Sequence, residues 1–123
     1  MQKIKVLTFF LFLSSVLLLS CDKDDDASSA YAEVKITKSG QSEAGVSVYM
    51  FEDNKGPNSG FFVPFHADKT IITEANGVAT FNLGSLDAQT TYYFGIFDSN
   101  DNVLGSTAMT VSAGQTKNAT IAY

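Results

Sequence analysis

The chain has 123 residues, and its 13 acidic side chains outnumber eight basic ones, which gives a formal net charge of −5. This length is enough for one domain and too short for two. All eight basic residues are lysines, so the chain lacks the planar guanidinium groups that grip phosphates, and its acidic charge argues against nucleic acid as a partner.

The first 20 residues have the pattern of a secretory signal peptide. Lys3 and Lys5 supply a positive start, and residues 6–19 are apolar apart from one threonine and two serines. A membrane-spanning helix needs about 20 apolar residues, so this segment is short for a span and is typical of a leader that is cleaved off. Cleavage removes two lysines and leaves six against 13 acidic residues, a net charge of −7.

The leader ends in Leu-Leu-Ser-Cys, with Cys21 as the only cysteine of the chain. This ending resembles the lipobox of bacterial lipoproteins, in which a small residue precedes a cysteine that is lipidated before cleavage makes it the first residue. The resemblance covers residues 3–21 and implies diacylglycerol on the thiol of Cys21 and an acyl group on its new amino group. Two or more acyl chains hold a soluble domain firmly at a membrane, whereas one binds marginally. The membrane is therefore an expected partner through Cys21.

An acidic run follows the cysteine and consists of Lys23, Asp24, Asp25 and Asp26. It resembles the export signal that directs some lipoproteins of Gram-negative bacteria to the outer face of the outer membrane. The alternative is a solvated linker, because like charges repel and keep a segment extended; both interpretations are compatible. We expect a signal peptide over residues 1–20, an acidic tether over residues 21–30, and an outer-membrane lipoprotein exposed at the cell surface.

From residue 31 onwards, short alternating segments are separated by Gly, Asn, Asp and Ser, with no long helical periodicity. In the first segment Ala32, Val34 and Ile36 point one way and the polar residues between them point the other, which predicts a half-buried strand. The aromatic segment 91–97 is expected at the centre of a sheet. The expected strands are residues 32–37, 46–51, 70–73, 78–83, 91–97, 103–111 and 117–123.

Two turns carry recognisable signals. Residues 74–77 end in Asn-Gly, the strongest local signal for a β-hairpin, so we expect residues 70–73 to pair with residues 78–83. In residues 98–102, oxygen-bearing side chains alternate as calcium ligands do, but the glycine and bidentate glutamate of an EF-hand loop are missing. Asp and Asn suit a tight turn equally well, and we interpret this segment as a turn.

Seven strands in residues 31–123 predict a single all-β domain, an immunoglobulin-like or transthyretin-like sandwich of two sheets packed face to face. The chain resembles the transthyretin-like, carboxypeptidase-regulatory-like group of modules in the strings Ala44–Val48, Thr73–Phe81, Leu86, Thr91–Phe94 and Val111–Thr116. The resemblance covers residues 33–123 except the insert described below. It implies a non-catalytic accessory, adhesive or binding module.

No residue set in the domain amounts to a catalytic site, and no metal or cofactor is expected. His66 is the only histidine, and although Asp68 is near it in sequence, no serine lies in a nucleophile elbow. The enzymes that resemble transthyretin need several basic and histidine side chains, which argues against that activity. An internal Lys–Asn isopeptide bond would need buried partners, whereas alternation points Lys35 and Asn118 outward.

Residues 52–69 form the least regular segment, here called the insert. It starts with loop-forming residues and continues into three phenylalanines, and four aromatic residues on the neighbouring strands point outward by parity. Either the insert folds over that outer face and hides it, or some rings stay exposed as a platform for a glycan or an envelope protein. The candidate binding surface is Tyr49, Phe51, Phe61, Phe62, Phe65, Tyr93 and Phe97.

Two classes of function remain. The first is a surface-anchored, non-catalytic binding or accessory module with a glycan or envelope protein as partner. The second is a structural or adhesin subunit that assembles by strand pairing, through residues 117–123 or the edge of the first strand.

Overall fold

The structure is a computed structural model that describes residues 28–123. The predicted signal peptide and the residues with predicted targeting roles, Cys21, Lys23, Asp24, Asp25 and Asp26, lie outside the described residues. The expected boundaries at residues 20 and 30 therefore stay predictions. Within residues 28–123, no helix is long and apolar enough to cross a membrane.

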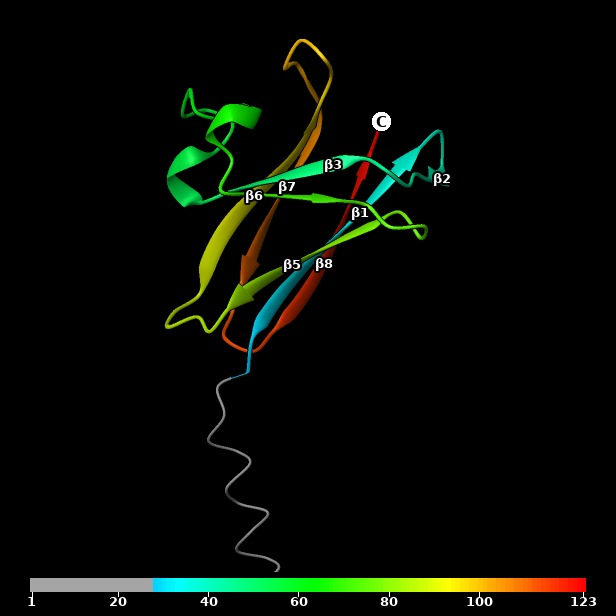
Figure 1. Cartoon of the computed structure of the whole chain (residues 1–123). Helices are drawn as coiled ribbons and strands as arrows, with labels where there is room; N and C mark the ends of the chain where they lie inside the picture. The colour runs from blue at the N-terminus through cyan, green and yellow to red at the C-terminus, as the bar shows by residue number, and fades with distance from the viewer. Residues whose placement is uncertain (1–27) are drawn as a thin grey trace, which may run out of the picture.

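Two β-sheets pack face to face, which confirms the predicted all-β sandwich (Figure 1). Sheet A consists of β1 (Ala30–Lys38), β2 (Gln41–Ser42), β5 (Val78–Gly84) and β8 (Thr116–Ala122). Sheet B has the order β4 (Lys69–Ile72), β3 (Ser47–Phe51), β6 (Thr90–Phe97) and β7 (Val103–Val111). The insert joins β3 to β4 and contains two short 3-10 turns, η2 (Asp53–Lys55) and η3 (Pro64–His66).

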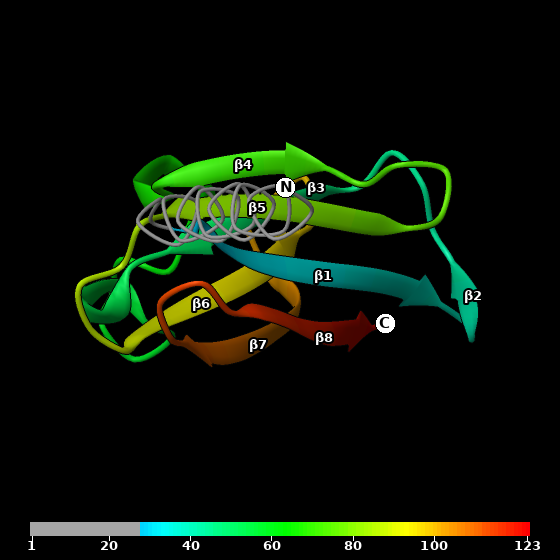
Figure 2. The same ribbon diagram turned by 90° about the horizontal axis from the view of Figure 1, so that it is seen from below.

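Strand β1 lies at the centre of sheet A. It pairs antiparallel with β5 and parallel with β8, so these three strands lie side by side (Figure 2). At its far end, β1 also pairs with β2. Both edges of β1 are therefore occupied, and the expectation that the edge of the first strand is open for pairing is wrong. Alternation along β1 does not reveal this, because the partner on one side is β8, the last strand of the domain.

The core lies between the sheets, where the inward side chains of both meet. On β1 the four alternate apolar residues from Ala30 to Ile36 are fully buried, as the predicted period of two requires. From sheet B, Phe94 is fully buried on β6, which pairs with β3 and β7 and is central as expected. Its ring centroid lies 5.1 Å from that of Phe81 on β5. Each large side chain buried in this way stabilises the fold by about 1.5–3 kcal/mol.

The turn before β5 forms, but the hairpin predicted around it is wrong. Gly77 N donates to Glu74 O at 2.8 Å, and Gly77 has the positive φ of 78° that favours glycine. Nevertheless β4 pairs with β3 in sheet B, and β5 pairs with β1 in sheet A. The chain crosses between sheets because Thr73 N donates to Val46 O (2.9 Å), whereas Ile36 N donates to Gly77 O (2.8 Å).

Candidate functional site

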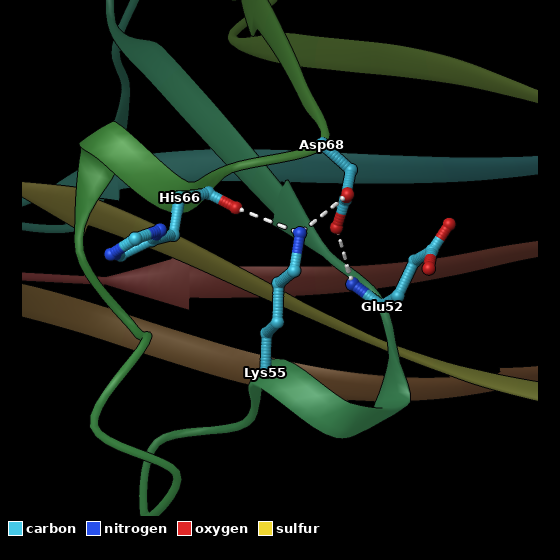
Figure 3. Close-up of polar contacts among 4 residues, drawn as sticks. All are labelled: Glu52, Lys55, His66 and Asp68. Atoms are coloured by element: carbon cyan, nitrogen blue, oxygen red, sulfur yellow. Dashed lines mark hydrogen bonds and ion pairs between the residues drawn. The ribbon is translucent and has the colours of Figure 1, made fainter.

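Polar contacts tie the two ends of the insert together (Figure 3). Lys55 Nζ lies 2.8 Å from Asp68 Oδ1 and donates a longer bond of 3.3 Å to the backbone oxygen of His66. Glu52 N donates to the other carboxylate oxygen of Asp68 at 2.8 Å, and Asp68 N donates to Met50 O at 2.8 Å. One carboxylate therefore joins the end of β3, the η2 turn and the residue before β4.

The same contacts set the protonation of Asp68. Partial burial on its own would raise the pKa of this carboxyl, but the hydrogen bonds from Lys55 and Glu52 N, with the lysine charge, hold the pKa below its usual value. A depressed pKa in the folded state contributes stability at neutral pH that is lost as the pH falls through the folded-state pKa.

We therefore expect Asp68→Asn to lower the free energy of unfolding by about 0.2–1 kcal/mol at pH 7, the range of an exposed ion pair. The difference from wild type should shrink as the pH falls below about 4, because the carboxyl then takes up a proton first in the unfolded state and, at lower pH, in the folded state. Urea denaturation at pH 7 and pH 3 measures it. Asp53→Asn, an exposed position in the same insert, is the control; an equal loss there at pH 7 would contradict the role of the ion pair.

Phe62 anchors the insert on the outer face of sheet B. Its side chain is 6% exposed, and its ring centroid lies 4.6 Å from that of Phe51 and 5.5 Å from that of Phe97. Gly95 leaves room for this ring, because a Cβ there would lie 2.7 Å from Phe62 Cζ. The part of the outer face around Gly95 is therefore covered by the insert, as expected from the first of the two alternatives, in which the insert folds over that face.

The other two phenylalanines of the insert stay in solvent. Phe65 is 87% exposed and Phe61 is 49% exposed. The imidazole of His66 stands between them, with centroids 5.2 Å from Phe61 and 5.1 Å from Phe65 and interplanar angles of 87° and 73°. We call these three residues the aromatic tip. In Figure 1 the insert lies on the sheet B side of the sandwich, whereas β1 starts on the sheet A side.

The seven residues of the predicted binding surface thus separate into three groups. Phe51 and Phe62 are buried against each other, so the expectation that they belong to an exposed surface is wrong. Parity placed Phe51 outward correctly, but the insert folds back over it. Phe61 and Phe65 are exposed. The remaining three, Tyr49, Tyr93 and Phe97, are half-buried.

The contacts that hold the aromatic tip, and the place of His66 between the two phenylalanines, were not predicted from the sequence. The Lys55–Asp68 pair spans most of the insert, and nothing in the local pattern of loop-forming residues indicates it. Gly95 was the available signal for the anchor, since a glycine inside an aromatic strand marks a close approach by another group.

The aspartates considered for catalysis and metal binding, Asp68 and Asp98, make hydrogen bonds within their own loops. The His66 ring points away from Asp68, whose carboxylate is engaged by Lys55 and Glu52 N (Figure 3). Asp98 Oδ1 accepts the backbone N–H of Asn100 and Asn102, both at 2.9 Å, which confirms the turn. The bond from Asn102 N, with the other bonds of the turn, lowers the pKa of Asp98. Residues 28–123 contain no cluster of three or more acidic, histidine or cysteine side chains placed to hold a metal.

Comparison with solved structures supports the fold. A DUF3823 family protein from Parabacteroides merdae superposes with a TM-score of 0.51 at 15% identity, over 79% of this chain and 46% of that protein. This chain therefore spans about half the length of its structural relative. The likeness shows a shared sandwich fold.

Two further similarities are weaker. The Bacillus anthracis TIE protein gives a TM-score of 0.48 at 10% identity, covering 77% of this chain and 16% of that one. Catechol 1,2-dioxygenase from Pseudomonas arvilla gives 0.46 at 11% identity, covering 80% and 53%. At these values neither supports a conclusion about this chain. No family model and no curated protein matches the sequence.

Proposed function

We propose that the protein is a lipid-anchored, non-catalytic binding module of the outer membrane, displayed at the cell surface and contacting its partner through the aromatic tip. The transthyretin-like, carboxypeptidase-regulatory-like strings and the two-sheet fold support the sandwich as a scaffold. The lipobox-like ending supports Cys21 as the anchor, and the acidic run supports surface display. The partner is a glycan or an envelope protein.

The observation that carries this proposal is the exposure of Phe65 on a loop that is held in place. Single apolar residues at a surface are ordinary, but here two exposed phenylalanines and a histidine gather at one tip. The Lys55–Asp68 pair and the buried Phe62 ring fix the loop before any partner arrives. A preformed tip loses little conformational freedom on binding, which favours affinity.

The position of the tip agrees with display. The insert lies on the sheet B side of the sandwich, whereas β1, which the predicted anchor precedes in the chain, belongs to sheet A (Figure 1). The tip and the strand that follows the predicted anchor therefore lie on different layers of the sandwich. The acidic charge of the chain also disfavours contact between the tip and anionic lipid.

Assembly by strand pairing has less support. Strand β1 is paired on both sides, and β8 uses one edge for β1. On its other side β8 packs against β7 so closely that a Cβ on Gly105 would lie 2.5 Å from Ile121 Cγ2. Of the two edges considered for assembly, that of β1 is therefore occupied, and β8 packs against β7 at Ile121.

Photo-crosslinking in intact cells that display the protein tests the role of the tip. A photoreactive phenylalanine analogue at Phe65 should give a discrete adduct, and adding Phe61→Ala should reduce its yield about tenfold. The same analogue at Leu104, an exposed apolar position on β7, is the matched control and should give none.

A glycan partner of the tip is tested on purified protein with a glycan array, where Phe65→Ala should remove binding of the glycan that the tip recognises. Phe65→Ala should change the free energy of unfolding by no more than about 0.5 kcal/mol, so that loss of binding is not loss of fold. If the analogue at position 65 gives no adduct, and Phe65→Ala removes no glycan binding, the proposed function is wrong.

A further inference from the structure

The outer face of sheet A carries a hollow of about 580 Å³. Its floor is made by outward side chains of β1, β5 and β8, and its wall by the turn that precedes β5. Strand pairing places Thr80 and Asn118 on either side of Glu33, and it places Thr120 beside Lys35. This volume lies within the range of about 300–1,000 Å³ found for small-ligand sites.

Asn76 Oδ1 in the lining of this hollow accepts from Val78 N at 3.1 Å, but the other polar side chains are not engaged by the described part of the protein. Within residues 28–123 the side chains of Glu33, Lys35 and Asn118 make no hydrogen bond or ion pair with protein, and neither do the hydroxyls of Thr80 and Thr120. A carboxylate, an ammonium, an amide and two hydroxyls therefore lie side by side with their bonding capacity unused. Together they offer both donors and acceptors.

The composition of the hollow decides which ligands it fits. Glu33 and Glu74 outweigh Lys35, so the local charge disfavours phosphate-rich and other polyanionic ligands. Val78 and Ala119 are the only apolar residues in its lining, which is too little for an acyl chain or an apolar peptide. A neutral ligand that is rich in hydroxyl groups can donate to the carboxylates and the amide oxygen and accept from the ammonium and the amide nitrogen.

We propose that this hollow binds a neutral oligosaccharide. Three neighbouring strands are spaced by about 4.8 Å and residues of one face by roughly 6.8 Å along each strand, so the polar groups form a patch long enough for a short saccharide chain. The hollow belongs to sheet A, whereas the aromatic tip belongs to the insert on sheet B. The proposal therefore stands apart from the proposed function of the tip.

The test is binding of the purified lipidated protein, in mild detergent, to an array of neutral glucans, mannans, galactans and xylans. Polygalacturonate and calcium chloride serve as acidic-glycan and cation probes. We expect binding to at least one neutral oligosaccharide. Glu33→Ala should weaken that binding at least tenfold, because a charged acceptor is lost, and Thr120→Val should weaken it two- to tenfold.

Thr116→Val is the matched control, because Thr116 lies on the same strand and the same outward face but outside the hollow. It should leave binding unchanged. Three results would overturn the proposal: no binding to any neutral glycan at millimolar concentration, binding only to polygalacturonate or calcium, or neutral-glycan binding that Glu33→Ala and Thr120→Val leave intact. Loss of glycan binding in Phe65→Ala alone would assign the glycan to the aromatic tip and also overturn this proposal.

Discussion

Replacing Cys21 by alanine is expected to abolish all fatty-acyl labelling of the protein. The thiol is the atom to which the resemblance to bacterial lipoproteins assigns diacylglycerol, and no other cysteine is present to replace it. Lipidation precedes cleavage in that family, so the variant should also keep its first 20 residues. Metabolic labelling with a radioactive fatty acid in a Gram-negative host, followed by intact mass measurement, reports both effects.

The matched control changes the three aspartates Asp24, Asp25 and Asp26 to alanine and leaves Cys21 in place. This variant should be acylated and cleaved like wild type but should lose accessibility to protease added outside the cells, because only the export signal is removed. A wild-type protein that retains its leader, or that carries no acyl group, would refute the anchor and the surface location together.

Replacing Thr73 by valine is expected to lower the free energy of unfolding by about 2–3 kcal/mol. Thr73 is 4% exposed, and its hydroxyl accepts from Val46 N at 3.0 Å and donates to Glu43 O at 2.8 Å. Valine has the same shape but leaves both backbone groups without that partner, at a cost of about 1–3 kcal/mol for a buried group. Glu43 and Val46 are partly exposed, so water recovers some of this loss.

Thr73→Ser separates the hydroxyl from the methyl group. Serine keeps both hydrogen bonds, so the free energy of unfolding should fall by only about 0.8 kcal/mol, the transfer free energy of one buried CH₂ group. Urea denaturation followed by circular dichroism measures both variants. If serine destabilises the protein as much as valine does, packing rather than hydrogen bonding holds this crossing between the sheets.

Local patterns in the sequence predicted the strands well and their partners poorly. Alternation placed Ala32, Val34 and Ile36 in the core, where they are fully buried. The Asn-Gly signal correctly predicted a turn, yet the strands beside it joined different sheets, because Thr73 and Gly77 bond to segments far from them in the chain. Turn chemistry acts over four residues, whereas sheet membership depends on contacts across the whole domain.

In the candidate sites too, local patterns predicted which way side chains point but not which of them come together. Parity correctly placed Lys35 and Asn118 outward, but their meeting in one hollow depends on the parallel pairing of β1 with β8, which no local pattern reports. In the insert, Phe62 and Phe65 are indistinguishable as sequence letters. The space above Gly95 decides that Phe62 is buried, and that space exists only after β3 and β6 have paired.

The pairing of β1 with β8 also has a consequence for when the domain can fold during translocation across a membrane. Strand β1 is completed on one side only when β8 arrives, and almost the entire domain separates the two in the chain. Pairing between such distant segments is slow, because the entropy cost of closing a long loop comes before the stabilising contacts between the strands can form. If such a chain crosses a membrane starting from its N-terminus, the domain would therefore remain unfolded, and able to pass, until β8 has also crossed.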